Sequence, residues 1–275
     1  MRKILIVDDD LVSSRLSQKI VEAEGYPTAT ARDGVEALEL LRRQDVDLAL
    51  IDVWMPRMTG LELMASIRRE GIGTKTVVMT SDSTPETLLQ AVREQAYQYL
   101  PKPVDPKVLV ELISAALSAA SGPAIEVLSA TPQWVELLVP CELETASRIQ
   151  SFMSRLNADL PDEVRDSVGQ VFREMLFNAV EWGGRLDPDR KVRIAYLRAR
   201  RMVLYRITDP GPGFKFEDLE HAAVAYSSGD MTHVDVRQQK GIRPGGFGIL
   251  MAKQMVDELI YNEVQNDVVF VKYLD

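Results

Sequence analysis

Short apolar runs separated by helical patterns fill the first 120 residues of the chain. The runs are Ile4–Val7, Leu48–Ile51, Thr76–Met79 and Tyr97–Leu100, with a weaker one at Thr28–Thr30. Strands that alternate with helices at this interval predict βαβ units and a parallel, doubly wound α/β sheet. Ligands of such sheets bind beyond the carboxyl ends of the strands, so the residues just after the runs are the ones to inspect for chemistry.

Acidic, hydroxyl and lysine side chains stand at those positions. They are Asp8 and Asp9, Asp52, Thr80, and Lys102. Three carboxylates at one edge repel one another unless a cation neutralises them, and an all-oxygen cluster suits Mg²⁺. A lysine and a hydroxyl close by would hold the oxygens of a phosphoryl group passed to a carboxylate. We therefore expect a site for phosphate on an aspartate; the alternative is a set of acidic loop caps and a lysine in a turn.

Residue by residue, segment 1–120 resembles a response-regulator receiver domain, which has a flavodoxin-like fold. The matching residues are Ile-Val-Asp8-Asp9-Asp10 with Arg15, Asp52-Val-Trp-Met-Pro56, Thr80-Ser81, and Tyr99-Leu-Pro-Lys102-Pro103. The resemblance implies that Asp52 is the phosphoacceptor and that an upstream sensor histidine kinase is a partner. It also implies that Asp9, Asp52 and the Trp54 carbonyl bind the metal directly, with Asp8 acting through water.

The same resemblance assigns the remaining roles in this segment. Thr80 and Tyr99 are the switch pair, Lys102 contacts the phosphoryl oxygens, and the Lys102–Pro103 bond is cis. Asp10 is expected to be a helix N-cap rather than a further ligand.

Beyond residue 120 the pattern predicts a linker and a second domain. Residues 121–133, rich in Pro, Ser, Thr and Ala, are predicted to be the linker, and residues 134–275 the domain. Expected there are a strand at Trp134–Val139, a helix at Glu142–Asn157, a long helix from Pro161, and a hairpin of Val192–Leu197 with Met202–Ile207.

Three motifs in this second domain suggest a nucleotide site. In the helical stretch Arg173–Gly184, Glu174 and Asn178 are four residues apart and therefore project from one face. Thr208–Phe214 follows a strand, and Arg243–Leu250 opens a helical pattern that continues to Glu258. Glycines just before a helix allow backbone N–H groups to approach phosphate oxygens. Each glycine motif alone is also an ordinary turn sequence, so the prediction depends on the ordered set of three.

This set resembles the GHKL ATPases, a group that includes gyrase, Hsp90, MutL and the histidine kinases, and most closely their anti-sigma-factor serine/threonine kinases. The resemblance implies an α/β-sandwich (Bergerat-type) domain that binds ATP and Mg²⁺. Asn178 would bind Mg²⁺, Asp209 would accept a hydrogen bond from the adenine amino group, and Glu174 would be the general base. The residues expected to shape the pocket are Gly211, Gly213, Gly245, Gly246, Phe247 and Gly248. Trp182 departs from the pattern, because many relatives have His there.

Two further stretches are open to more than one interpretation. Residues 214–245 show little periodicity and correspond to the lid that closes over ATP in GHKL relatives; His221 and His233 are expected to be polar lid residues. The arginine-rich stretch from Arg185 to Arg206 is read as a solvated strand face, with a docking surface for an acidic partner as the alternative.

Composition adds limits to this picture. The 275 residues are 46% hydrophobic and 27% charged, with a net charge of −9, which is typical of ordinary globular domains. Neither half is basic, so direct nucleic-acid binding is not expected. Cys141 is the only cysteine, and no apolar stretch is long enough to span a membrane or act as a signal peptide. We expect a cytoplasmic protein without a membrane partner, in which Cys141 is a buried small residue.

Together these patterns predict an ATP-dependent protein serine/threonine kinase of the anti-sigma-factor type, controlled by phosphorylation of Asp52. Its protein partner would be an anti-anti-sigma-type protein, with a sigma factor as a second partner. One alternative is a non-catalytic module that uses ATP to sequester a regulator. Another is a histidine-kinase-like phosphorelay protein, which residues 104–213 disfavour because they contain no His. The sequence does not identify the partner or the upstream kinase, and it leaves open the sign of regulation and whether the chain is a homodimer.

Overall fold

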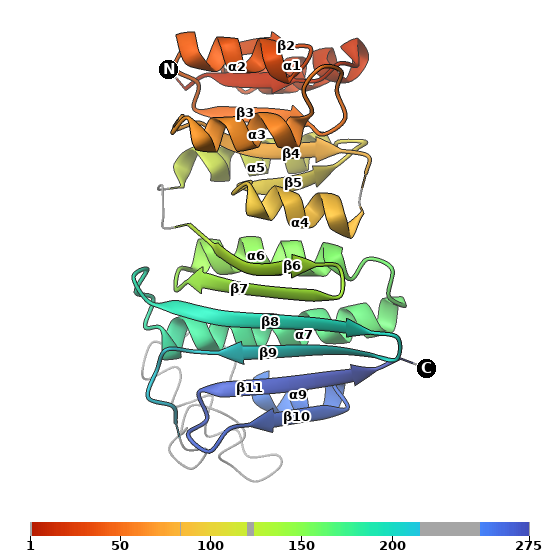
Figure 1. Ribbon diagram of the computed structural model, residues 1–275, viewed down its shortest axis with the longest axis vertical. Helices are drawn as coiled ribbons and strands as arrows, with labels where there is room; N and C mark the ends of the chain where they lie inside the picture. The colour runs from red at the N-terminus through yellow and green to blue at the C-terminus, as the bar shows by residue number, and fades with distance from the viewer. Residues whose placement is uncertain (1, 83, 120–123, 215–247, 275) are drawn as a thin grey trace. The chain divides into compact units, whose positions relative to one another are not determined.

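The computed structural model describes residues 2–82, 84–119, 124–214 and 248–274. The chain divides into two compact units, Met1–Gly122 and Pro123–Asp275, and each has its own sheet (Figure 1). Among the described residues, no helix combines the length and apolarity needed to cross a membrane.

The first unit contains a parallel five-stranded sheet in the order β2-β1-β3-β4-β5. Its core side chains, from β1, β3 and β4, pack against α1 and α5 on one face of the sheet, while α2, α3 and α4 lie on the other (Figure 1). The elements are β1 Ile4–Val7, α1 Leu11–Ala23, β2 Thr28–Ala31, α2 Gly34–Arg43, β3 Leu48–Asp52, α3 Gly60–Arg69, β4 Lys75–Thr80, α4 Pro85–Arg93, β5 Gln98–Pro101 and α5 Pro106–Ser118. The predicted doubly wound fold is confirmed.

The second unit is an α/β sandwich. Its antiparallel sheet has the order β10-β11-β9-β8-β7-β6, and helices α6, α7 and α9 lie on one face (Figure 1). The elements are β6 Glu126–Thr131, β7 Trp134–Pro140, α6 Leu143–Leu156, α7 Asp162–Asn178, the π-helix η1 Ala179–Gly183, β8 Lys191–Ala199, β9 Met202–Thr208, α9 Gly248–Met255, β10 Glu258–Tyr261 and β11 Asp267–Tyr273. The two-domain fold class inferred from the sequence is confirmed.

Two sequence expectations in this unit are wrong. Residues 126–131, assigned to the linker, form the edge strand β6, because they pair with β7 across a bulge between Val127 and Ser129. The helix expected to continue to Glu258 ends at Met255, and Glu258 begins β10, which pairs with β11.

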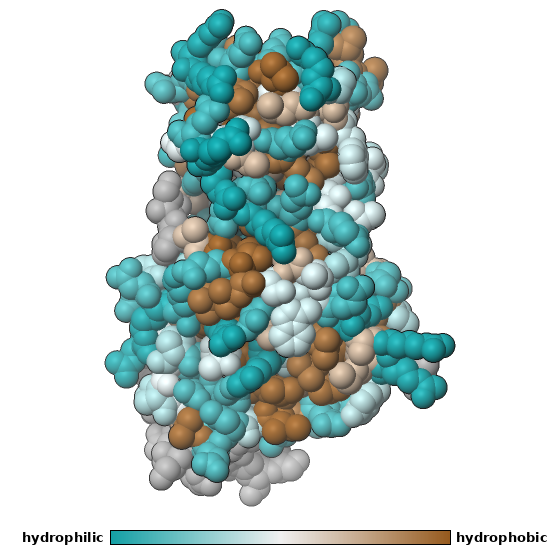
Figure 2. Space-filling view, in the orientation of Figure 1, coloured by the Kyte–Doolittle hydropathy of each residue, from teal (hydrophilic) through white to brown (hydrophobic). Residues whose placement is uncertain are grey.

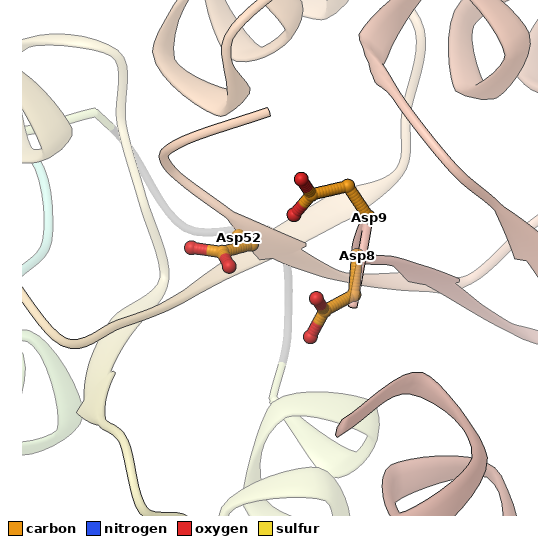
Figure 3. Close-up of side chains that lie close together, drawn as sticks. All are labelled: Asp8, Asp9 and Asp52. Carbon is orange, nitrogen blue, oxygen red and sulfur yellow. The ribbon is translucent and has the colours of Figure 1, made fainter. Parts of the chain in front are cut away.

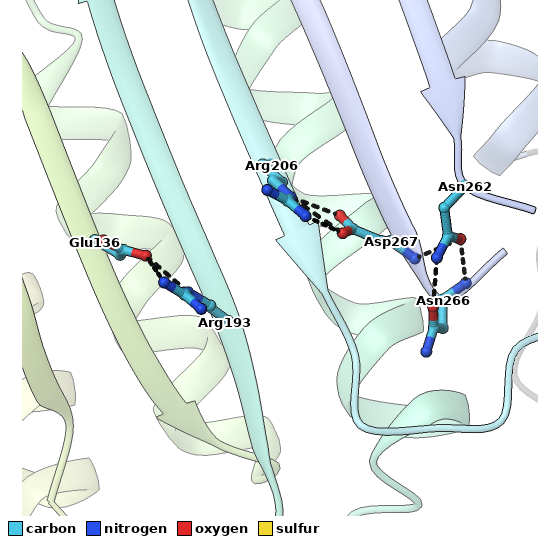
Figure 4. Close-up of polar contacts among 6 residues, drawn as sticks. All are labelled: Glu136, Arg193, Arg206, Asn262, Asn266 and Asp267. Atoms are coloured by element: carbon cyan, nitrogen blue, oxygen red, sulfur yellow. Dashed lines mark hydrogen bonds and ion pairs between the residues drawn. The ribbon is translucent and has the colours of Figure 1, made fainter. Parts of the chain in front are cut away.

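The uncovered face of the second sheet carries both apolar and charged side chains. Trp134 is 41% exposed, whereas its neighbour Val135 is buried on the helix side. Figure 2 shows apolar side chains lying between hydrophilic ones over these strands. Arg193 pairs with Glu136 and Arg206 with Asp267 on this face (Figure 4).

Salt bridges hold several basic side chains of the arginine-rich stretch from Arg185 to Arg206. Lys191 pairs with Glu126 and Arg198 with Asp159, in addition to the two pairs just described. Carboxylates therefore neutralise four of its basic groups, which favours the solvated-face interpretation over an acidic partner's docking surface.

Candidate functional site

The ends of β1 and β3 bring three carboxylates together in the first unit. Asp8 and Asp9 follow β1, and Asp52 is the last residue of the neighbouring strand β3. Each offers an oxygen within 4.8 Å of the others (Figure 3). Asp8 and Asp52 are buried, whereas Asp9 is exposed. An all-oxygen set with this spacing fits Mg²⁺, so these residues, predicted from the sequence to lie together, do form a cluster that would hold the ion.

One ammonium group is shared between the two buried carboxylates. Lys102 Nζ lies 2.8 Å from Asp8 Oδ2 and 2.5 Å from Asp52 Oδ2. Burial raises the pKa of Asp52 and the bond from Lys102 opposes it. Burial would lower the pKa of Lys102, but the two carboxylates outweigh it and raise that pKa. The lysine therefore stays charged, and it lies where it could contact the oxygens of a group attached to the Asp52 carboxylate. The Lys102–Pro103 bond is cis, as the resemblance implies.

The proposed switch residues both contact the backbone of Asp82. Thr80 is fully buried at the end of β4, and its Oγ1 accepts a bond from Asp82 N at 3.1 Å. The buried Tyr99 donates its hydroxyl proton to Asp82 O at 2.6 Å. The Asp82 carboxylate accepts a bond from Trp54 Nε1 at 3.1 Å, on the loop after Asp52. The sequence analysis missed Asp82, although an acidic residue two positions before the helix N-cap Thr84 was a visible signal.

Two smaller features complete this site. Asp10 caps α1 by accepting a bond from Val12 N at 2.8 Å, as expected. Ser13, which the sequence analysis did not single out, donates to Asp8 Oδ2 at 2.7 Å. Ser13 and Lys102 therefore orient the same carboxylate oxygen.

The second candidate site lies along α7. Glu174 and Asn178 are partly buried on this helix, and neither side chain makes a hydrogen bond or ion pair to another described residue. Gly248, the first residue of α9, approaches Glu174 so closely that a methyl group there would lie 2.4 Å from Glu174 Oε2. The structure therefore brings Glu174 and Gly248 together, as the prediction of one pocket requires. Gly245, Gly246, Phe247 and the predicted lid with His221 and His233 lie outside the described residues.

Asp209, one residue after β9, lies against the end of this helical stretch. A methyl group on Gly183, the last residue of η1, would be 2.2 Å from the Asp209 carboxylate. Gly211 N donates to Asp209 Oδ1 at 2.7 Å, and Oδ2 has no hydrogen bond to any described residue. Burial raises the pKa of Asp209, opposed by that bond and by Arg190. A half-buried carboxylate with one free oxygen is an acceptor for a donor on a ligand.

The π-helix was not predicted from the sequence, and its end is closely packed. Gly184 N bonds to Ala179 O at 2.7 Å, a step of five residues. A methyl group on Gly184 would lie 2.1 Å from Sγ of the buried Cys141. Burial raises the pKa of the Cys141 thiol to about 11, consistent with the expected role as a buried small residue. Single π-turns within helices are frequent at functional sites, and this one directs the chain toward Asp209. Trp182, the departure from the family pattern, is 47% exposed.

Comparisons with known proteins match the two units that carry these candidate sites. Residues 4–114 match the response regulator receiver domain, and residues 139–272 match the histidine kinase-like ATPase domain. The chain is 30% identical over 203 residues to the DNA-binding response regulator MtrA of Mycobacterium tuberculosis, covering 72% of this chain and 87% of MtrA. The chain belongs to the response regulator family. Its receiver domain is followed by an ATPase domain of the histidine-kinase-like (GHKL) type.

Other relatives match about half of this response regulator or less. The transcriptional regulatory protein GlrR of Escherichia coli is 32% identical over 136 residues, which are 50% of this chain and 29% of GlrR. A CheY-like receiver domain protein from Methanospirillum hungatei JF-1, a solved structure, is 32% identical with a TM-score of 0.42, covering 43% of this chain and 94% of that one.

Proposed function

We propose that this response regulator is an ATP-dependent protein serine/threonine kinase of the anti-sigma-factor type, switched by phosphorylation of Asp52. The proposal rests on one observation in the second unit. Two side chains on α7 without a partner among the described residues, Glu174 and Asn178, lie on the helical stretch whose far end contacts Asp209, a carboxylate whose Oδ2 has no hydrogen bond to a described residue. That set offers an acceptor for a nucleobase, an oxygen ligand for a metal, and a base.

ATP would bind with its adenine against Asp209. The free Oδ2 would accept a hydrogen bond from the adenine amino group, while Gly211 N holds Oδ1 in place. Asn178, one residue before η1, would offer its side-chain oxygen to Mg²⁺. When bound, the ion neutralises charge on the phosphate oxygens during transfer. The rest of the catalytic effect would come from positioning.

Glu174 would act as the general base. Its carboxylate takes the proton of a partner's serine or threonine hydroxyl as that oxygen forms a bond to the γ-phosphorus. The bond from the γ-phosphorus to the bridging oxygen breaks, and ADP leaves with that electron pair. Because Glu174 has no partner among the described residues, its oxygens are available for this proton.

In the receiver, Asp52 would accept a phosphoryl group from an upstream sensor histidine kinase. The cluster of Asp8, Asp9 and Asp52 would hold Mg²⁺ together with the Trp54 carbonyl. Lys102 lies 2.5 Å from the acceptor carboxylate and would contact the phosphoryl oxygens, as would the Thr80 hydroxyl. Tyr99 would respond through Asp82, the residue that both switch side chains contact.

MtrA is named as a DNA-binding protein, but the region after the receiver in this chain matches the ATPase model. We therefore propose ATP binding as the output. The protein partner would be an anti-anti-sigma-type protein that carries the acceptor hydroxyl, with a sigma factor as a further partner.

Incubation with γ-³²P-ATP and co-purified partners tests the reaction type. Acid-stable label on a small partner is expected, because phosphoserine and phosphothreonine survive acid. Acid-labile label on the chain itself from ATP would indicate histidine-kinase chemistry. ATP binding without any transfer would indicate a sequestering module, and either of these last two results would contradict the proposed activity.

A further inference from the structure

The turn between β10 and β11 is hydrogen-bonded to the loop that carries Asp209. Asp209 N donates to Asn266 O at 2.8 Å, and Asn266 Nδ2 donates to Gly211 O at 3.1 Å. Asn266 therefore bonds to the loop on both sides of Pro210, and Gly211 N in turn holds Asp209 Oδ1. Asn266 thus bonds both to Asp209 and to Gly211, the residue whose N–H holds Asp209 Oδ1.

The turn is itself locked by a reciprocal pair of asparagines. Asn262 Nδ2 donates to Asn266 Oδ1 at 2.8 Å, and Asn266 N donates to Asn262 Oδ1 at 3.0 Å (Figure 4). Asp267 N donates to the same oxygen of Asn262 at 3.2 Å. With both ends of its amide engaged, the Asn266 side chain has one orientation.

Further contacts fasten the turn to the loop and to the end of β9. Phe214 N donates to Val264 O at 3.1 Å. Gly213 has a left-handed φ of 82°, and a methyl group there would lie 1.7 Å from Val264 O. Arg206 on β9 forms ion pairs with Asp267, the first residue of β11. The loop is therefore supported along its length by residues 262–267.

We infer that Asn266 is a positioning residue for recognition of the adenine base, acting through Gly211 and Asp209. The Nδ2 donor fixes the carbonyl of Gly211, and the N–H of the same residue fixes which oxygen of Asp209 is held. Without the donor, the loop keeps its backbone bond to residue 266 but the orientation of the carboxylate relaxes. The inference rests on the proposed adenine-binding role of Asp209.

Asn266→Asp removes the Nδ2 donor and adds a negative charge, whereas Asn266→Ala removes the donor without adding a charge. The aspartate keeps an oxygen to accept the bond from Asn262, so the turn survives, but it has no donor for Gly211 O. Asn266→Ala removes both contacts. Glu263→Ala is the matched control, because Glu263 is an exposed residue of the same turn whose side chain makes no bond to another described residue.

The measurement is the dissociation constant of the full chain with Mg²⁺ for ATP and for purine riboside 5′-triphosphate, which lacks the amino group. Loss of one positioned hydrogen bond should weaken ATP binding about five- to tenfold in Asn266→Asp, leave the analogue nearly unchanged, and so reduce the preference for ATP by the same factor. Glu263→Ala should keep the wild-type preference.

A purely structural role for Asn266 would weaken both nucleotides equally, and that result would overturn the inference. So would an unchanged preference in both Asn266 variants of a chain whose wild type binds ATP. Wild-type protein that binds neither nucleotide would instead overturn the proposed function, and the inference with it.

Discussion

Two glycines at the end of the π-helix η1 are packed too closely to carry a side chain. Gly183 and Gly184 lie against the Asp209 carboxylate and Cys141 Sγ, respectively, at distances that leave no room for a methyl group. The sequence predicted that Asp209 and α7 belong to one site. It did not show why Gly183 and Gly184 follow the helix. That reason depends on strands far away along the chain.

Gly183→Ala is expected to weaken ATP binding more than tenfold, because the new methyl group would displace Asp209. Gly169→Ala, in the preceding helix α7, is the control: nothing lies within 4 Å of its new methyl group. It should leave ATP affinity unchanged and stabilise the second unit by up to about 1 kcal/mol, since alanine is the better helix former. Isothermal titration with Mg²⁺-ATP would detect the difference, and equal affinities for the two variants would contradict the placement of Asp209.

Alanine substitutions at Glu174 and Asn178 should impair different steps, phosphotransfer and nucleotide binding respectively. Glu174→Ala is expected to keep ATP binding and lose about 10²- to 10⁴-fold in phosphotransfer, because a general base acts on the rate. Asn178→Ala should lose Mg²⁺-ATP binding itself, because it removes the side-chain oxygen that would bind the ion, while Glu174 on the same face would serve the acceptor hydroxyl. Nucleotide titration and single-turnover transfer separate the two. Full turnover in Glu174→Ala would remove it from its proposed role.

At the scale of elements, an ion pair fastens the loop after Asp52. Arg57, with a left-handed φ of 64°, bonds to the buried carboxylate of Asp33. Asp33 also caps α2 by accepting from Val35 N and Glu36 N. The loop that carries the Trp54 carbonyl is thereby tied to the start of α2.

Asp33→Ala is expected to lower the unfolding free energy of the first unit by about 2–3 kcal/mol at pH 7, from the lost cap and the lost partner of Arg57. Asp33→Asn, which can still cap, should cost about 1 kcal/mol. Asp105→Ala removes a cap of α5 without an ion pair and should also cost about 1 kcal/mol. Hydrogen exchange of first-unit amides in urea would report the three values, and equal losses for all three would contradict a role for the ion pair.

The contribution of Asp33 to the unfolding free energy of the first unit depends on pH in a defined direction. Burial alone would raise the pKa of Asp33, but bonds from Glu36 N–H and Arg57 outweigh it and hold the pKa below its ordinary value of 3.8. A carboxyl group with a depressed native pKa stabilises the fold at pH values above its ordinary, unfolded-state pKa. That stability is lost as the pH falls through the native pKa. The difference between wild type and Asp33→Asn should therefore be full at pH 7 and shrink below about pH 4.

Local patterns predicted most elements, and the exceptions have tertiary causes. β1 and β3 were evident because short apolar runs end in acidic residues. β6 was missed because an edge strand with half-exposed side chains resembles a linker. The π-turn requires Gly184 to pack on Cys141, and the role of Asn266 requires β11 to lie beside β9. In sequence, Asn262 and Asn266 indicate only a turn.

At the scale of the whole molecule, the two units carry complementary chemistry on one chain. The receiver holds Asp52 in a cluster of three carboxylates, and the second unit matches an ATPase domain. Lys75 Nζ in β4 bonds to Ala116 O and Ala119 O at the end of α5, 2.7 and 2.5 Å away. The strand that ends at Thr80 is thus fastened to the helix that leads into the second unit. A rearrangement at Thr80 biases the ATPase only if the two phosphorylation states make different contacts.

The most direct measurement of the central claim is the rate of phosphate transfer from ATP to the co-purified partner, with and without Mg²⁺ and beryllofluoride to mimic phosphate on Asp52. The rate in the wild type is predicted to shift when the mimic binds, and Asp52→Asn, which cannot hold the mimic in the same way, should show no shift. Identical rates in the wild type with and without the mimic, or no transfer under either condition, would contradict a kinase switched by its own receiver.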